Sequence, residues 1–111
     1  MRIREFQIHI WNIYKKHDSR RGVENTLKWF LSEVYEFTKA VEKGDLNSIR
    51  EEAADVLAWL SSVLNLLGID LEGAALDRYG RGCPKCNSIP CKCNYRDKPG
   101  KDVECITKNQ L

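Results

Sequence analysis

The segment WFLSEVYEFTKAVEKGDLNSIREEAADVLAW, residues 29–59, decides the fold of this chain. Apolar side chains recur at helical spacing on both sides of Gly44, and a glycine in such a position typically ends a helix. The pattern predicts one helix over residues 23–43 and a second from about residue 46 or 49 to residue 67. Two helices joined by so short a turn form an antiparallel hairpin.

Shorter helices are predicted on either side of the hairpin. Apolar residues at helical spacing indicate a helix over residues 2–16, and a polar stretch that ends in glycine, residues 17–22, predicts a loop. Residues 71–79 predict a last helix that ends at Gly80. No stretch of useful length alternates with the period of a strand, so the sequence predicts an all-α body. Three residues are alternative N-caps for the helix after the turn: Asp45, Asn47 and Ser48.

The composition excludes several classes of protein. The 111 residues are 42% hydrophobic and 31% charged, which is typical of a globular chain and not of a disordered or fibrous one. No apolar run approaches the roughly 20 residues of a membrane-spanning helix, and the first residues do not resemble a secretory signal. We therefore expect a cytoplasmic protein with no membrane partner. Because so small a chain buries limited surface, we expect a metal or an oligomer interface to stabilise it.

The net charge and the residue composition both change near the end of the last predicted helix. Residues 1–79 contain 11 Lys and Arg against 13 Asp and Glu, a balance of −2, whereas residues 80–111 contain 7 against 3, a balance of +4. Gly, Pro and Cys dominate the second part, where no helical stripe continues. The sequence therefore predicts an all-α domain over residues 1–80, a zinc-binding loop over 81–93 and a polar tail over 94–111.

Four carboxylates occupy mirrored positions in the hairpin. Glu33 and Glu36 lie three residues apart in its first helix, which places them on one side of that helix. Glu52 and Asp55 do the same in its second helix. Glu36 and Glu52 are each 8 residues from Gly44, and the other two acids are each 11 residues from it. Because residues equally far from an antiparallel turn lie at equal height, the four acids are predicted to form one layer.

Such a layer requires a compensating charge. Negative charges this close repel strongly at low dielectric, and oxygen ligands favour hard cations, so Mg²⁺ or Mn²⁺ is the predicted cofactor. The alternative is a solvated acidic face that pairs with nearby cations: Lys39, Lys43 and Arg50. Trp29 and Trp59, each 15 residues from Gly44, are predicted about one turn above the acids. The two indoles serve either as core or as a wall that stacks on a ligand base.

The pattern Glu-x-x-Glu, 15 intervening residues and Glu-x-x-Asp on a helical hairpin resembles the MazG-like nucleotide pyrophosphohydrolases, the all-α NTP pyrophosphatases. The resemblance spans about residues 18–79, with Arg-Gly at 21–22 and ADVL at 54–57. It implies that the four acids hold Mg²⁺, that the products are a nucleoside monophosphate and pyrophosphate, and that aberrant nucleotides are cleared. It also implies a homodimer or a dimer-based tetramer. Ser32 and Tyr35 stand where the family pattern often has a further Glu and a small residue.

The reaction implied by the resemblance assigns roles to individual residues. A carboxylate must accept the proton of the attacking water, and Glu36 is the first choice, with Glu33 also catalytic. Arg78 and Arg81 are the candidates to contact the outer phosphates, although the end of a helix also attracts cations through its dipole. Two residues of the predicted polar loop are further candidates to approach a nucleotide, although a histidine in such a loop is more often only solvated: His17 and Arg21.

Four of the five cysteines lie within 11 residues, in the form C-x₂-C-x₄-C-x-C: Cys83, Cys86, Cys91 and Cys93. Four thiolates on a Gly- and Pro-containing loop can close a tetrahedral zinc site of structural type. Disulfides and independent reduced thiols are the alternatives. Some archaeal MazG-like proteins carry a similar Cys-rich tail. The sequence thus favours a structural Zn²⁺, and no role is assigned to Cys105.

These observations support one function ahead of two others. The first is an Mg²⁺-dependent nucleoside triphosphate pyrophosphohydrolase. The second is a zinc-containing nucleic-acid-binding or regulatory module built on a helical dimer, in which the basic tail makes the contact. Four carboxylates without a metal would repel phosphates, so nucleic acid is not the expected partner of the body. The third is a purely structural helical dimer.

Overall fold

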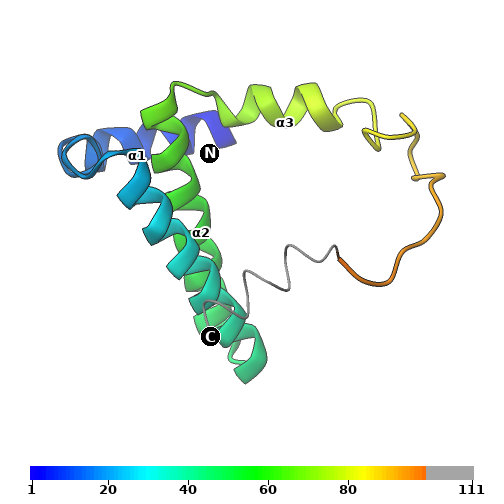
Figure 1. Cartoon of the computed structure of the whole chain (residues 1–111), viewed down its shortest axis with the longest axis horizontal. Helices are drawn as coiled ribbons and strands as arrows, with labels where there is room; N and C mark the ends of the chain where they lie inside the picture. Colours follow the sequence, from blue (N-terminus) through cyan, green and yellow to red (C-terminus); the bar gives the residue numbers. More distant parts are fainter. Residues whose placement is uncertain (100–111) are drawn as a thin grey trace. The chain divides into compact units, whose positions relative to one another are not determined.

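The computed structural model describes residues 1–99, which contain three helices and no strand (Figure 1). Helix α1 spans Ile3–Lys43, α2 spans Leu46–Leu67 and α3 spans Leu71–Tyr79. The all-α fold class is therefore confirmed. No single helix among these residues is long and apolar enough to cross a membrane, and only α2 and α3, taken together as a bent pair, meet that test by length and composition.

The chain divides into two compact units, Met1–Ala74 and Ala75–Leu111, and each is described by itself. The first unit contains α1, α2 and the start of α3, and the second contains the rest of α3 and the cysteine-rich segment. The finer division into residues 1–80, 81–93 and 94–111 stays a prediction, because much of the last part lies outside the described residues.

The turn between α1 and α2 has the predicted position. Gly44 adopts a left-handed conformation with φ 73°, and its N–H donates to the carbonyl oxygens of Ala40 and Val41. Asp45 is the N-cap of α2: its side chain accepts from the N–H of Asn47 at 3.3 Å and from the hydroxyl of Ser48 at 2.7 Å. Among the three cap candidates, the structure selects the aspartate, whose carboxylate satisfies an otherwise unpaired helix donor.

Helix α1 consists of two straight parts that meet at Gly22, where φ is 80° and ψ is 170°. The predicted loop over residues 17–22 is wrong, because the first part remains helical through Arg21. The guanidinium of Arg21 donates to Asp18 at 2.8 Å, an i,i+3 ion pair that stabilises this last turn. Gly22 alone makes the bend, in a backbone region that only glycine enters readily. Figure 1 shows the second part of α1 running beside α2.

Buried amide groups attach the first part of α1 to the end of α2. Gln7 is only 6% exposed, and its amide nitrogen donates to the side chain of Asn65 at 3.1 Å and to the carbonyl of Ile69 at 2.8 Å. Its amide oxygen accepts from the N–H of Leu71 at 2.8 Å. The side chain of Asn65 in turn donates to the carbonyl of Gln7 at 3.1 Å. The side-chain nitrogen and oxygen of Gln7 are therefore both paired, as their burial requires.

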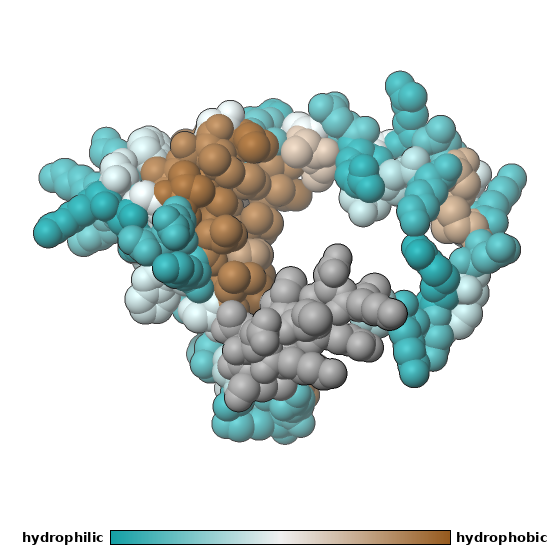
Figure 2. Space-filling view, in the orientation of Figure 1, coloured by the Kyte–Doolittle hydropathy of each residue, from teal (hydrophilic) through white to brown (hydrophobic). Residues whose placement is uncertain are grey.

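The apolar core of the single chain is small. Among the described residues, the buried hydrophobic side chains are Ile10, Ala40 and Val63. Several members of the predicted apolar stripes stay largely exposed: Leu27 at 44%, Val41 at 50% and Leu57 at 37%. Figure 2 shows a continuous hydrophobic area over α2. Contiguous apolar surface of this kind marks an interaction site more often than a solvated face.

Candidate functional site

Three of the four predicted carboxylates meet between the two helices of the hairpin. Glu33 comes from α1, and Glu52 and Asp55 come from α2. One carboxylate oxygen of each lies within 4.8 Å of the others. The mirrored spacing about Gly44 brings these side chains together, although they are up to 22 positions apart in the sequence, from 33 to 55.

Charge repulsion and an unpaired oxygen characterise this cluster. Burial, followed by the charges of Asp55 and Glu52, raises the pKa of Glu33. Glu52 has a buried oxygen, Oε2, with no hydrogen-bond partner. Among residues 1–99, no lysine or arginine forms an ion pair with any of the three. A divalent cation held by oxygen ligands would satisfy the unpaired oxygen and offset the repulsion, so the residues present fit the metal.

Glu36 lies apart from these three carboxylates. Its side chain is exposed, and it does not belong to the group whose oxygens fall within 4.8 Å. Its charge nevertheless contributes to the raised pKa of Glu33. Nearby, the ammonium of Lys39 lies 5.1 Å from the ring centroid of Tyr35. Glu36 is therefore a solvent-accessible neighbour of the cluster.

The two predicted tryptophans stack on each other. The ring centroids of Trp29 and Trp59 are 5.3 Å apart and their planes differ by 8°. This contact agrees with the antiparallel register inferred from equal distances to Gly44. The guanidinium carbon of Arg21 lies 4.7 Å from the centroid of the Trp59 ring. Arg21 thus links the end of the first part of α1 to the tryptophan pair.

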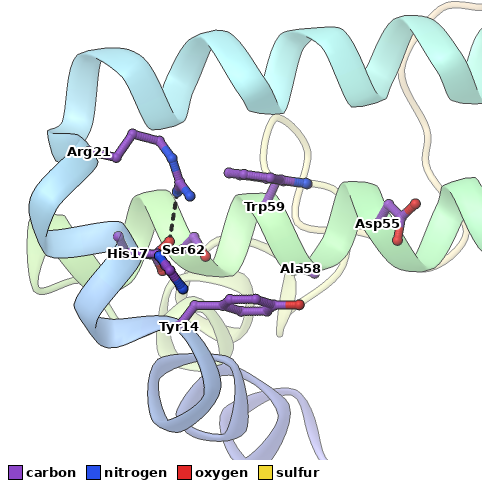
Figure 3. A pocket seen from close by; sticks show the side chains of 8 residues that line it. Tyr14, His17, Arg21, Asp55, Ala58, Trp59 and Ser62 are labelled. Carbon is purple, nitrogen blue, oxygen red and sulfur yellow. Dashed lines mark hydrogen bonds and ion pairs between the residues drawn. The ribbon is translucent and has the colours of Figure 1, made fainter.

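A pocket adjoins the acidic cluster, with a cavity volume of about 180 Å³. Asp55 belongs both to the cluster and to the pocket wall (Figure 3). The sequence singled out Arg21, His17, Trp59 and Asp55, but it did not indicate the others, because they lie together only after α1 bends at Gly22. The full lining is Tyr14, His17, Asp18, Arg21, Asp55, Ala58, Trp59 and Ser62.

Comparison with known families agrees with this arrangement. The sequence model of the MazG nucleotide pyrophosphohydrolase domain matches residues 21–86, more than half of the 111 residues. The chain belongs to this family. A search among curated proteins gives no match. The matched region of the MazG domain contains both hairpin helices, all four predicted acids and the first two cysteines of the cluster.

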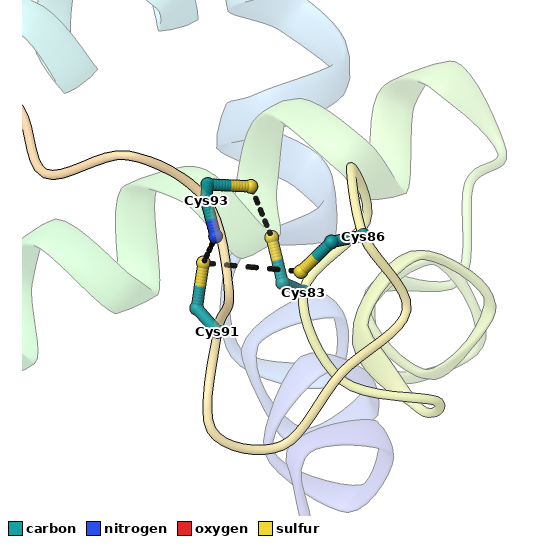
Figure 4. Close-up of side chains that lie close together, drawn as sticks. All are labelled: Cys83, Cys86, Cys91 and Cys93. Atoms are coloured by element: carbon teal, nitrogen blue, oxygen red, sulfur yellow. Dashed lines mark hydrogen bonds between the residues drawn. The ribbon is translucent and has the colours of Figure 1, made fainter.

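The second unit of this MazG protein contains the four clustered cysteines (Figure 4). Their sulfur atoms lie within 4.8 Å of one another, with 3.8 Å between Cys83 and Cys93 and 4.0 Å between Cys86 and Cys91. All four are free thiols. A tetrahedral zinc ion with bonds of about 2.3 Å needs sulfur atoms about 3.8 Å apart. The cluster therefore fits zinc.

Backbone N–H groups point at these sulfurs. The N–H of Lys92 donates to Cys86 at 3.3 Å, and the pKa of Cys86 is lowered to about 6 mainly by this bond. Hydrogen bonds with Cys91 and the other thiols raise the pKa of Cys93 to about 12. Gly82 has φ 115°, and a Cβ there would lie 2.6 Å from the carbonyl oxygen of Ser88. The loop thus needs glycine at this position to bring its two halves together.

The remaining predicted site residues lie in the second unit. Arg78 is near the end of α3, with its guanidinium carbon 6.0 Å from the ring centroid of Tyr79, and Arg81 follows the helix as an exposed residue. Their contact with phosphates stays a prediction. Cys105 lies outside the described residues.

Proposed function

We propose that this protein is a divalent-cation-dependent pyrophosphohydrolase of ribo- or deoxyribonucleoside triphosphates that acts in the cytoplasm. It cleaves the bond between the α- and β-phosphates and releases a nucleoside monophosphate and pyrophosphate, which would remove aberrant nucleotides. The observation that supports it best is the cluster of Glu33, Glu52 and Asp55, with its unpaired buried oxygen, inside a MazG domain.

The carboxylates hold Mg²⁺ or Mn²⁺ and the chain supplies the proton acceptor. Glu33, Glu52 and Asp55 are the ligands, with Glu36 beside them. When bound, the cation neutralises the triphosphate and polarises the α-phosphate. A water oxygen attacks the α-phosphorus, the bond to the bridging oxygen breaks, and the proton passes to a carboxylate. Glu36, which is exposed and outside the cluster, is our first choice for this base, and Glu33 is the second.

Other residues are proposed to hold the nucleotide. Trp59, backed by Trp29, offers a flat surface for a base, and aromatic stacking of this kind is worth about 1–3 kcal/mol per base. Arg78 and Arg81 are proposed to bind the outer phosphates, because guanidinium groups match phosphate oxygens in a bidentate manner.

We further propose that the protein is a homodimer or a dimer-based tetramer. Leu27, Val41 and Leu57 belong to the predicted apolar stripes and remain exposed in the single chain. Figure 2 shows that apolar surface continues over α2. Burying such surface stabilises by roughly 25 cal/mol per Å². Light scattering at micromolar concentration should give at least twice the 12.8 kDa mass of one chain, and a stable monomer would contradict this proposal.

A structural Zn²⁺ is proposed for the cysteine cluster. The sulfur distances match a tetrahedral site of four thiolates. Such a site is closed, as in structural zinc sites, and leaves no ligand position for a substrate or a reactive water. The segment has little apolar surface of its own to bury, so metal binding would supply its folding free energy. Its role is to stabilise the segment that contains the four cysteines.

The decisive experiment measures pyrophosphate release from a panel of nucleoside triphosphates, with and without Mg²⁺, by the wild type and Asp55→Asn. We expect cation-dependent release with the monophosphate as co-product, and a loss of about 10²–10³-fold in the variant, as when one electrostatic contributor to a transition state is removed.

Glu51→Gln is the matched control. Glu51 is exposed and precedes Glu52 on the same helix, so the variant removes an equal charge without touching the cluster. Its activity should equal that of the wild type. If the folded wild type, with cation present, releases pyrophosphate from none of the nucleotides, the proposed reaction is contradicted. That result would favour the alternative of a zinc-containing nucleic-acid-binding module.

A further inference from the structure

The four clustered cysteines of the second unit form two sulfur–sulfur contacts. The sulfurs of Cys83 and Cys93 lie 3.8 Å apart, and those of Cys86 and Cys91 lie 4.0 Å apart (Figure 4). Four cysteines allow three ways of forming two disulfides, and the sequence alone does not choose among them. The two contacts favour the nested pairing, in which the inner pair lies within the loop that the outer pair closes.

Each of the two pairs joins an exposed thiol to a half-buried one. Cys91 and Cys93 are exposed, whereas their partners, Cys86 and Cys83, are half-buried. Redox-sensing cysteines are solvent-accessible and often lie beside a second thiol that resolves the oxidised product. Because all four sulfurs are thiolates when they hold a metal, access to solvent decides which of them meets an oxidant first. The exposed member of each pair is therefore the one that reacts.

Backbone hydrogen bonds position the inner pair. The N–H of Lys92 donates to the sulfur of Cys86 at 3.3 Å, and the N–H of Cys93 donates to the sulfur of Cys91 at 3.3 Å. Both donors belong to the main chain, so these contacts do not require a metal. The inner sulfurs thus have a means of staying close together when the thiolates no longer share an ion.

We propose that this segment is a thiol–disulfide switch, in which a hydroperoxide converts the four thiolates to two disulfides, Cys83–Cys93 and Cys86–Cys91, with release of the zinc. The release rests on the proposed zinc site, whereas the pairing rests on the geometry of the segment. Neither depends on the proposed pyrophosphohydrolase activity. In the reducing compartment proposed for this protein, disulfides are usually transient and often sense oxidants.

The formation of each disulfide consumes one hydroperoxide. The exposed thiolate attacks one peroxide oxygen, the O–O bond breaks, and the other oxygen leaves as an alkoxide or hydroxide that takes a proton from solvent. The sulfenic acid that results is attacked at sulfur by the half-buried thiolate. The S–S bond forms, the S–O bond breaks, and the hydroxide that leaves takes a second proton. Two electrons have then passed from the pair of sulfurs to the peroxide, and a dithiol reverses the step by exchange.

The segment loses its metal in this reaction because the thiolate is the form of cysteine that binds zinc. Zinc-loaded protein is treated with hydrogen peroxide, and the free zinc is measured with a chromogenic chelator. We expect about one zinc released per chain for about two molecules of peroxide consumed, and full recovery of zinc binding after reduction by a dithiol. Thiols that stay reduced, or that oxidise only to sulfinic and sulfonic acids, would overturn the proposal.

The pairing is read from tryptic peptides after the remaining thiols have been alkylated. Cleavage after lysine and arginine separates the four cysteines onto three peptides: residues 82–85, 86–92 and 93–96. The nested pairing joins the first peptide to the third and leaves the second with an internal bridge. Each of the other two pairings joins all three peptides. A product that contains all three would therefore overturn the proposal.

Two variants serve as controls. Cys83→Ser removes one member of the outer pair, so the internally bridged peptide 86–92 should still form and Cys93 should be alkylated. Cys105→Ser should release zinc and give the same peptides as the wild type; their loss in this variant would overturn the pairing. Protein that holds no zinc but gives the nested products would contradict the zinc site and leave the disulfide switch standing. Because the readouts are zinc and peptides, failure of the nucleotide assay does not affect them.

Discussion

The carboxylate cluster and the cysteine cluster bring their candidate metal ligands together in opposite ways. Glu33, Glu52 and Asp55 come from two long helices, and their meeting depends on the register of the whole hairpin. The four cysteines come from 11 consecutive positions, 83–93, and their meeting depends on local backbone turns. Oxygen ligands suit a hard cation and thiolates suit zinc. Ligands that are far apart in the sequence are brought together by the tertiary structure, whereas ligands that are close in the sequence are brought together by the spacing of a few residues.

The largest effect should follow from removing one thiolate. Cys86→Ser is expected to lower the zinc content from about one ion per chain to near zero, because a structural site needs all four ligands. Helix content should change little, since the cluster lies outside the three helices. Metal analysis and circular dichroism measure the two quantities. Cys105→Ser removes the one cysteine that is not among the four predicted ligands, and this variant should keep its zinc. Zinc retained by Cys86→Ser would refute the site.

A substitution in the carboxylate cluster should lower the activity and, without added cation, raise the stability. Glu52→Gln is expected to lower pyrophosphate release by about 10²–10³-fold. Without added cation, the same variant should be more stable toward urea than the wild type, because one of three mutually repelling charges is gone. Denaturant titration with and without Mg²⁺ measures this. A metal-free Glu52→Gln less stable than the wild type would show that repulsion does not dominate the cluster.

A backbone substitution tests how much the bend in α1 depends on glycine. Gly22→Ala is expected to lower the free energy of unfolding by about 1–3 kcal/mol, the typical cost of forcing a non-glycine residue into such a region. No atom lies within 4 Å of the Cβ position, so the effect is one of conformation and not of collision. Denaturant unfolding measures it. Arg20→Ala, at an exposed helical position two residues earlier, should change stability by only a few tenths of that amount.

The smallest effect concerns an exposed ion pair between the start of α1 and the start of α3. Hydrogen bonds from Arg4, at 2.6 Å for the shortest, hold the pKa of Asp70 below its ordinary value. A lowered folded pKa contributes stability that is complete above the unfolded value of about 3.9 and is lost as the pH falls toward the folded value.

Asp70→Asn should therefore unfold at lower urea concentration than the wild type near neutral pH, and the two midpoints should converge in acid. Asp77→Asn removes the same charge from α3 without the Arg4 pair, and its midpoint should follow the wild type at every pH. A gap between wild type and Asp70→Asn that stays constant down to about pH 2 would contradict the linkage.

Much of the fold is readable from the sequence because its signals are local. Gly44, Gly68 and Gly80 mark helix ends, and α2 and α3 have the predicted limits at Leu67 and Tyr79. The stretch before Gly22 is misread as a loop because its polarity hides the ion pair between Asp18 and Arg21 that stabilises a helical turn. A single bend at glycine and a loop of six residues look alike in composition.

The site is readable only where helix periodicity determines it. Counting from Gly44 is enough to pair Trp29 with Trp59 and to bring Glu33, Glu52 and Asp55 together. Counting does not say that Glu36 is exposed, since side-chain direction and burial depend on packing. Nor does it reveal the buried oxygen of Asp18, because the position of the first part of α1 against α2 depends on the bend and on the amide contacts of Gln7 with Asn65.

The bend at Gly22 separates the pocket residues in the first part of α1 from the acidic cluster. An α-helix turns by about 100° and advances by about 1.5 Å for each residue. One extra residue just before Gly22 would swing Tyr14, His17 and Asp18 around their own axis, while Glu33, Glu52 and Asp55 lie beyond the joint and keep their register. The same acidic cluster can thus acquire a different set of pocket residues beside it through a change in the length of one helical segment.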